Sequence, residues 1–137
     1  MRAARQLRSM DLILPLAFRA TMSDAAHATP DREICGLLLG EGLRVTNILP
    51  AANSAPDPAT GFEIDPAILI TAHKTARAGG PAIIGCYHSH PNGKAEPSPR
   101  DAEAAEPGSV WVIVANGQIS AWRYRADRFE SLAILPS

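Results

Sequence analysis

The sequence has few cysteines, few aromatic residues and almost no net charge, and each shortage excludes a class of protein. Its two cysteines, Cys35 and Cys86, are too few for a small secreted domain held together by disulfides. Aromatic residues make up 5% of the chain and the formal net charge is −1, which argues against nucleic-acid binding. No apolar run approaches the roughly 20 residues that a membrane-spanning helix requires. We therefore expect a cytoplasmic protein that binds neither nucleic acid nor membranes, with both cysteines as buried free thiols.

The composition is that of one globular domain. Hydrophobic residues make up 46% of the 137 residues and charged residues 20%. A basic start followed by "LILPLAF" resembles a signal peptide, but Asp11 and Pro15 interrupt the apolar stretch and Arg19 ends it early. We expect a single domain over residues 1–137, with residues 1–9 as a disordered N-terminal segment. The abundance of alanine and arginine indicates a GC-rich bacterium.

The apolar pattern predicts strands and helices that are interleaved along the chain and end in a meander. Bounding glycines, prolines and helix-capping residues set the limits of these elements. Strands are expected at residues 10–14, 34–40, 43–51, 62–65, 82–90, 110–115, 119–125 and 129–135. Helices are expected from Pro15 to about Ala28, from Pro66 to about Ala78, and from Ser98 to near Pro107. The fold class is therefore α/β of the α+β type, with about seven or eight strands and about three helices.

The stretch "GCYHSHP" places two histidines one residue apart in an expected strand. Side chains at alternate positions of a strand share a face, so His88 and His90 point the same way with bases about 6.5 Å apart. Two imidazoles at this spacing can converge on one metal ion. Ser89 points to the opposite face and is not a ligand of the same ion.

A third ligand must come from elsewhere, and Asp101 in "SPRD" is the obvious candidate. The preceding loop, "PNGKAEP", can bend the chain back toward the histidines. Two histidines and a carboxylate leave one tetrahedral position open, as in a catalytic zinc site. The same residues also form a sound helix start, with Ser98 at N-cap, Pro99 at N1 and Asp101 completing a capping box. From spacing alone, both interpretations remain open.

Other metal-binding candidates are weaker. Cys86 shares the face of the histidines, but it would lie about 13 Å from His90 on a straight strand. Glu96 falls in the loop and is expected to be solvated. His73 lies within a helix and His27 near the end of one, where we expect structural or surface roles.

A hydrolytic metal site also needs a general base, which sequence spacing cannot select. Glu33 directly precedes the buried-type strand "ICGLLLG". A carboxylate at that position is either a solvated charge at the sheet edge or a catalytic group, and the pattern does not decide between them.

The combination of Glu33, "HSHP" at residues 88–91 and "SPRD" at residues 98–101 resembles the JAMM (MPN+, JAB-domain) zinc metalloprotease family. The flanking segments "PDREICGLLLG", "FEIDP" and "IIGCYHSHP" are similar to those of a compact prokaryotic member. The resemblance extends over nearly the whole chain. It implies a mixed, curved β-sheet packed by helices, an MPN fold related to the cytidine-deaminase architecture.

The resemblance also implies a role for each motif residue. His88, His90 and Asp101 would bind one Zn²⁺ per chain. Glu33 would act as general base and then general acid, and Ser98 would stabilise the oxyanion. The implied substrate is a peptide or isopeptide bond at the C-terminal tail of a ubiquitin-like, sulfur-carrier type protein.

Two other functions fit parts of this pattern. A non-catalytic MPN-type domain would scaffold other proteins, although such domains usually lack the metal ligands that are all present here. A non-haem iron oxygenase also uses two histidines and a carboxylate. Those enzymes commonly have all-β barrels, and they would leave Glu33 and Ser98 without a role.

Overall fold

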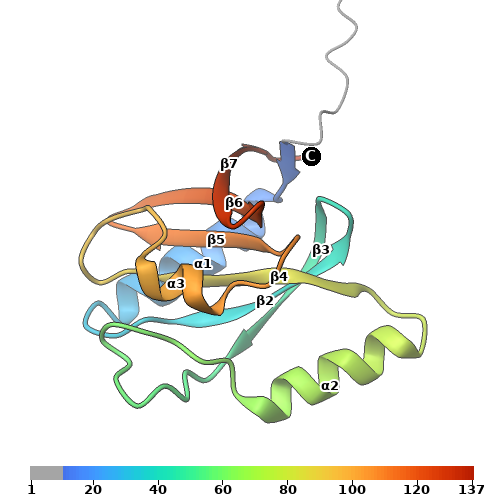
Figure 1. The fold of residues 1–137 in the computed structure, drawn as a ribbon, viewed down its shortest axis with the longest axis horizontal. Helices are drawn as coiled ribbons and strands as arrows, with labels where there is room; N and C mark the ends of the chain where they lie inside the picture. The colour runs from blue at the N-terminus through green and yellow to red at the C-terminus, as the bar shows by residue number, and fades with distance from the viewer. Residues whose placement is uncertain (1–10) are drawn as a thin grey trace, which may run out of the picture.

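The computed structural model describes residues 11–137, which form seven strands and three helices (Figure 1). The strands are β1 Asp11–Ile13, β2 Cys35–Glu41, β3 Arg44–Ala51, β4 Ala82–Ser89, β5 Val110–Ala115, β6 Gln118–Arg125 and β7 Arg128–Leu135. The helices are α1 Leu16–Ala28, α2 Pro66–Arg77 and α3 Pro99–Ala104. The expected N-terminal segment at residues 1–9 lies outside the described residues. None of the helices in the described part combines the length and apolar character needed to cross a membrane.

The strands form one mixed sheet that closes on itself in the order β1-β3-β2-β4-β5-β6-β7. β4 and β5 are parallel, and β1 runs parallel to both of its neighbours, β3 and β7. The remaining pairs are antiparallel. The mixed, curved sheet and the three helices expected from the sequence are confirmed. Helix α1 packs on β5 and helix α2 on β4, while α3 follows the loop that leaves β4 (Figure 1).

The central strands are buried because their side chains are apolar on both faces. All six residues of β5, "VWVIVA", are buried, and β2 is buried over most of its length. Leu38 of β2, Val112 of β5 and Met22 of α1 are fully inaccessible and belong to one core. This core fixes the middle of the sheet, from which the motif residues extend.

Two local expectations are wrong. Residues 62–65 form no strand of the sheet. Their backbone instead pairs with the preceding loop, through one isolated β-bridge between Asn53 and Ile64. Pro15 does not enter the first turn of α1 but stands at its N-cap, since the helix begins at Leu16.

The close pairing of β4 and β5 depends on Gly85. It lies opposite Val110 at the point where β5 joins β4. A Cβ atom at Gly85 would fall on the backbone carbonyl of Val110, which is itself held in the ladder. Backbone atoms cannot rotate aside as a side chain can, so only glycine fits at this position.

We predict that Gly85→Ala lowers the free energy of unfolding by about 3 kcal/mol, at the upper end of the usual range for overpacked sites. The matched control is Gly61→Ala, because the new methyl group would meet only the end of the exposed Arg100 side chain, which can move. Urea denaturation of both variants measures the difference. A Gly85→Ala protein as stable as Gly61→Ala would contradict this account of the β4–β5 junction.

Candidate metal centre

The two histidines of "HSHP" meet at the end of β4. The Nε2 atoms of His88 and His90 lie 3.0 Å apart. Oδ2 of Asp101 lies 3.3 Å from Nε2 of His88 and 3.1 Å from Nε2 of His90. All three residues are buried. The structure therefore brings together the three residues that the spacing singled out as possible ligands.

Helix α3 places Asp101 by means of its N-terminal cap. The backbone N–H of Asp101 donates to Oγ of Ser98 at 3.1 Å, and the backbone N–H of Ser98 donates to Oδ2 of Asp101 at 2.9 Å. Pro99 occupies the first turn. The expected capping box is confirmed, and the carboxylate oxygen that closes it is the one that faces both histidines.

Glu33 reaches the same place from the start of β2. One ligand atom each of Glu33, His88 and His90 lie within 4.8 Å of one another, so these three also form a group that could hold a metal ion. The adjoining backbone is fixed by Ser89, whose Oγ accepts from the N–H of Ile34 at 2.9 Å and whose own N–H donates to the carbonyl of Ile34 at 3.0 Å. Glu33 is 6% exposed, which excludes a solvated charge at the sheet edge.

The surroundings of Glu33 make it ready to exchange a proton near neutral pH. Burial raises the pKa of its carboxyl to about 7, although the nearby His90 and Arg100 oppose the rise. The neighbouring Asp101 adds to it. Its Oε1 atom is buried and has no hydrogen-bond partner among the described residues.

The other ionisable groups are shifted in different directions. Burial opposes the charge on Asp101, but hydrogen bonds from His88 and His90 outweigh it and hold the pKa of the carboxyl below its usual range. Burial lowers the pKa of His88, which favours its neutral form. Burial also acts to lower the pKa of His90, but bonds to Asp101 and to the Lys94 carbonyl outweigh it and raise this pKa.

These donors fit a metal ion. The Nδ1 atom of His90 lies 2.8 Å from the carbonyl oxygen of Lys94 and must donate to it, so the Nε2 atom of the neutral ring carries a lone pair. That lone pair faces Nε2 of His88 at 3.0 Å and Oδ2 of Asp101 at 3.1 Å. Tetrahedral ligands at 2.0–2.1 Å from zinc would be about 3.3 Å from one another. A cation between these atoms would take the place of the protons that otherwise join the histidines to Asp101 by hydrogen bonds.

Three neighbours of the centre were not identified from the sequence. The Phe62 ring stacks on His88 with centroids 4.3 Å apart and planes inclined by 20°. Trp111 meets the same imidazole edge-on at 5.4 Å. Lys94 contributes only its backbone carbonyl. Phe62 and Trp111 looked like ordinary apolar residues in the sequence, and a backbone carbonyl leaves no signal in side-chain identity.

The weaker candidates lie apart from the centre. His27, His73 and Glu96 are exposed, as expected of surface residues. Cys35 is a buried free thiol as expected, whereas Cys86 is only partly buried because it lines a cavity of about 740 Å³ beside α2.

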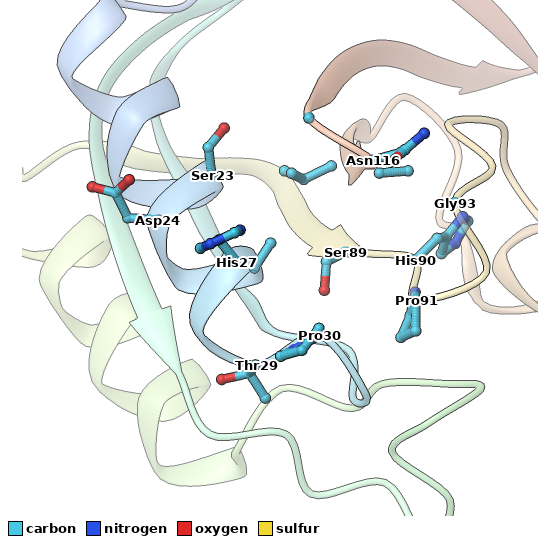
Figure 2. Close-up of a pocket in the computed structure, with 14 residues that line it drawn as sticks. Ser23, Asp24, His27, Thr29, Pro30, Ser89, His90, Pro91, Gly93 and Asn116 are labelled. Atoms are coloured by element: carbon cyan, nitrogen blue, oxygen red, sulfur yellow. The ribbon is translucent and has the colours of Figure 1, made fainter.

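A second cavity, of about 500 Å³, lies between the end of α1 and the end of β4 (Figure 2). The side chains of Ser89 and His27 point into it (Figure 2). None of Glu33, His88, Ser98 and Asp101 lines it. His90, which does, is the residue it shares with the metal centre.

Comparison with known proteins identifies relatives with stated activities. The chain is 32% identical over 115 residues to a desampylase of Haloferax volcanii, an alignment that covers 81% of this chain and 83% of that protein. It is also 32% identical over 111 residues to a probable TtuB-protein conjugate cleaving protease of Thermus thermophilus, covering 80% of this chain and 75% of the relative.

Solved structures share the fold. The solution structure of a protein from Desulfitobacterium hafniense matches with a TM-score of 0.74 and 27% identity, covering 92% of each chain. A JAB1/MPN domain protein from Archaeoglobus fulgidus matches with a TM-score of 0.59 over 90% of this chain and 96% of that one. At 17% identity the second likeness supports the fold alone.

A family model also matches most of the chain. It describes prokaryotic homologs of the JAB domain and aligns with residues 15–125, a range that contains all five motif residues. Together with the relatives at 32% identity, this match establishes the family. The chain belongs to the prokaryotic homologs of the JAB domain.

Proposed function

We propose that the chain is a metal-dependent isopeptidase that cleaves conjugates of a ubiquitin-like protein. The observation that supports this most directly is the meeting of His88, His90 and Asp101 beside the buried carboxylate of Glu33. The relatives named desampylase and TtuB-protein conjugate cleaving protease support the reaction class. We propose that residues 1–137 form one JAMM metalloprotease domain and that the protein is cytoplasmic.

We infer that His88 and His90, through Nε2, and Asp101, through its carboxylate, hold one zinc ion. Two histidines and one carboxylate are a donor set of catalytic zinc sites, in which the fourth position stays open. When bound, the ion would polarise the scissile carbonyl and lower the pKa of a water molecule toward about 7. The carbonyl of Lys94 holds the His90 ring so that Nε2 remains available as a ligand.

Glu33 acts as the general base and then as the general acid. Burial raises the pKa of its carboxyl above the usual range, which suits a group that accepts a proton from the attacking water and then releases it to the leaving amine. Oε1 has no competing hydrogen bond among the described residues. The two hydrogen bonds between Ile34 and Ser89, one from the Ser89 N–H to the Ile34 carbonyl and one from the Ile34 N–H to the Ser89 hydroxyl, keep the carboxylate of Glu33 beside the histidines.

Ser98 stabilises the oxyanion that develops on the substrate carbonyl. Its Oγ accepts a hydrogen bond from the backbone N–H of Asp101, so the hydroxyl hydrogen remains free to be donated. A single well-aimed donor of this kind is worth roughly 3–4 kcal/mol in the transition state.

The partner is a ubiquitin-like protein, and we propose the sulfur-carrier type as its class. The scissile bond would then follow the C-terminal tail of the carrier, where an isopeptide bond joins it to a lysine of the conjugated protein. Hydrolysis of that bond yields the free carboxylate of the tail and the free lysine amine.

Removal of the metal is expected to abolish cleavage. Protein treated with a chelator should leave an isopeptide-linked conjugate of a sulfur-carrier protein intact, and stoichiometric Zn²⁺ should restore cleavage as followed by mass spectrometry. His88→Ala should bind no metal and show no activity, whereas the exposed His73→Ala control should keep both. A metal-loaded protein that cleaves no such conjugate would contradict the proposed reaction, and a chain that binds no metal would favour a scaffold.

Glu33→Gln should bind metal normally but lose turnover by about 10²- to 10⁴-fold, because the amide cannot accept the proton of the attacking water. Glu96→Gln is the matched control, since Glu96 is an exposed carboxylate in the loop before α3. Single-turnover cleavage and metal content should be measured on both. Near-wild-type cleavage by Glu33→Gln would exclude Glu33 as the base.

Ser98→Ala should lower kcat by about 10²- to 10³-fold and destabilise the protein by about 1 kcal/mol, because it removes both an oxyanion donor and a helix cap. Asp65→Ala isolates the second effect, since Asp65 caps α2 through the N–H of Ala67. We expect that control to lose similar stability at unchanged kcat. Equal rates for the two variants would assign Ser98 to capping alone.

A further inference from the structure

Asn53 lies just beyond the end of β3 and uses its side-chain amide fully. Its Nδ2 group donates to the backbone carbonyls of Glu33 at 2.9 Å and of Gly61 at 3.0 Å. Its Oδ1 atom accepts from the backbone N–H groups of Ala55 at 2.9 Å and of Glu63 at 3.1 Å. Four hydrogen bonds are the complete capacity of a primary amide with two donors and two lone pairs.

These bonds join two parts of the metal centre. One reaches the backbone of Glu33 itself. Two others join Asn53 to the backbone of Gly61 and Glu63, the residues on either side of Phe62. The Phe62 ring stacks on His88 with centroids 4.3 Å apart. Asn53 therefore links the residue that supplies the carboxylate to the residue that covers one face of a histidine.

The loop between β3 and α2 is also held by backbone hydrogen bonds. The N–H of Glu33 donates to the carbonyl of Pro58 at 2.7 Å, and that of Gly61 donates to the carbonyl of Asp57 at 3.1 Å. Among the described residues, Asn53 is the side chain that bonds both to Glu33 and to the residues on either side of Phe62.

The loop contains no strand or helix, and its backbone forms a single bridge, between Asn53 and Ile64. In a loop without a ladder, side chains that bond to the backbone add to its few backbone hydrogen bonds. Both Nδ2 bonds end on carbonyl oxygens, so an aspartate at this position would place a carboxylate oxygen against two acceptors.

We propose that Asn53 is a positioning residue. It holds the carboxylate of Glu33 and the ring of Phe62 at fixed positions relative to His88. The inference rests on the proposed hydrolytic function and names a residue outside the five of the motif. The four hydrogen bonds of the Asn53 side chain all go to backbone groups, so it acts through the backbone of the loop and of Glu33. A small displacement of a catalytic group from its reactive geometry can cost about 100-fold in rate.

The kinetic test uses Asn53→Asp, which keeps the size and the acceptor oxygen but loses both donors. We expect kcat for conjugate cleavage to fall about 10- to 100-fold while KM changes less than about twofold. Asn47→Asp is the matched control, because Asn47 is exposed on β3 and its side chain only accepts a hydrogen bond from Thr46. That control adds the same charge and should leave kcat and KM unchanged.

A second measurement needs no activity. In metal-free protein, the ring current of Phe62 should shift the NMR signals of the His88 imidazole protons, and Phe62→Leu gives the value without the ring. Asn53→Asp should move these signals toward the Phe62→Leu value and speed the hydrogen exchange of the Glu63 amide. A residue that contributes only to overall stability would leave the native-state signals in place.

Three results would overturn the inference. One is a kinetic result other than the expected fall in kcat at constant KM. The folded Asn53→Asp protein would then either keep the wild-type kcat or show a KM that rises by as large a factor as kcat falls. Another is a His88 signal that stays at the wild-type position. The third is failure of both Asn53→Asp and Asn53→Ala to fold, which would assign Asn53 to folding alone. If the wild-type protein cleaves no conjugate, the proposed function fails, and the NMR measurement still decides whether Asn53 positions the centre.

Discussion

The pairing of the start of β2 with the end of β4 is the constraint on which the candidate site depends. Cys35 lies opposite His88 in the antiparallel ladder, and two hydrogen bonds between Ile34 and Ser89, one of them to the Ser89 hydroxyl, extend the pairing by one residue. Ile34 and Ser89 are 55 residues apart in the sequence. Because β2 and β4 are neighbours in the closed sheet, flanked by β3 and β5, their ladder brings Glu33 to the histidines.

Local patterns in the sequence predicted the parts of this site that lie close together along the chain. The two-residue period of a strand placed His88 and His90 on one face, and "SPRD" predicted the capping box that the structure contains. Apolar runs bounded by turn residues located all seven strands of the described residues to within about one residue. Glu33 was different, because its burial depends on which strand pairs with which, and spacing holds no information on that choice. Only the resemblance to a family selected it.

The supporting residues could not be predicted for a related reason. Asn53 lies in "ANSAPDPATG", whose composition predicts a loop and nothing more. Its four partners become neighbours only when residues 52–65 fold back on themselves and against Glu33. The same folding back explains why "FEID", whose pattern predicts a strand, does not join the sheet. Its backbone does form β-type contacts, but with the loop that precedes it rather than with the sheet.

Asp101 and Ser98 can cap helix α3 and also serve the metal centre. Capping uses only some of the lone pairs of the Asp101 carboxylate and the Ser98 hydroxyl, and it leaves the hydroxyl hydrogen free. Capping takes one lone pair of Asp101 Oδ2, through the N–H of Ser98, and one lone pair of Ser98 Oγ, through the N–H of Asp101. A carboxylate has about four acceptor positions and a hydroxyl keeps its own hydrogen. The carboxylate can therefore still serve as a ligand, and the Ser98 hydroxyl can still donate to a substrate oxygen. The bonds to backbone N–H groups at the helix start also restrict both side chains to one conformation. The entropy cost of ordering them is therefore met on folding and does not weaken metal binding or slow catalysis.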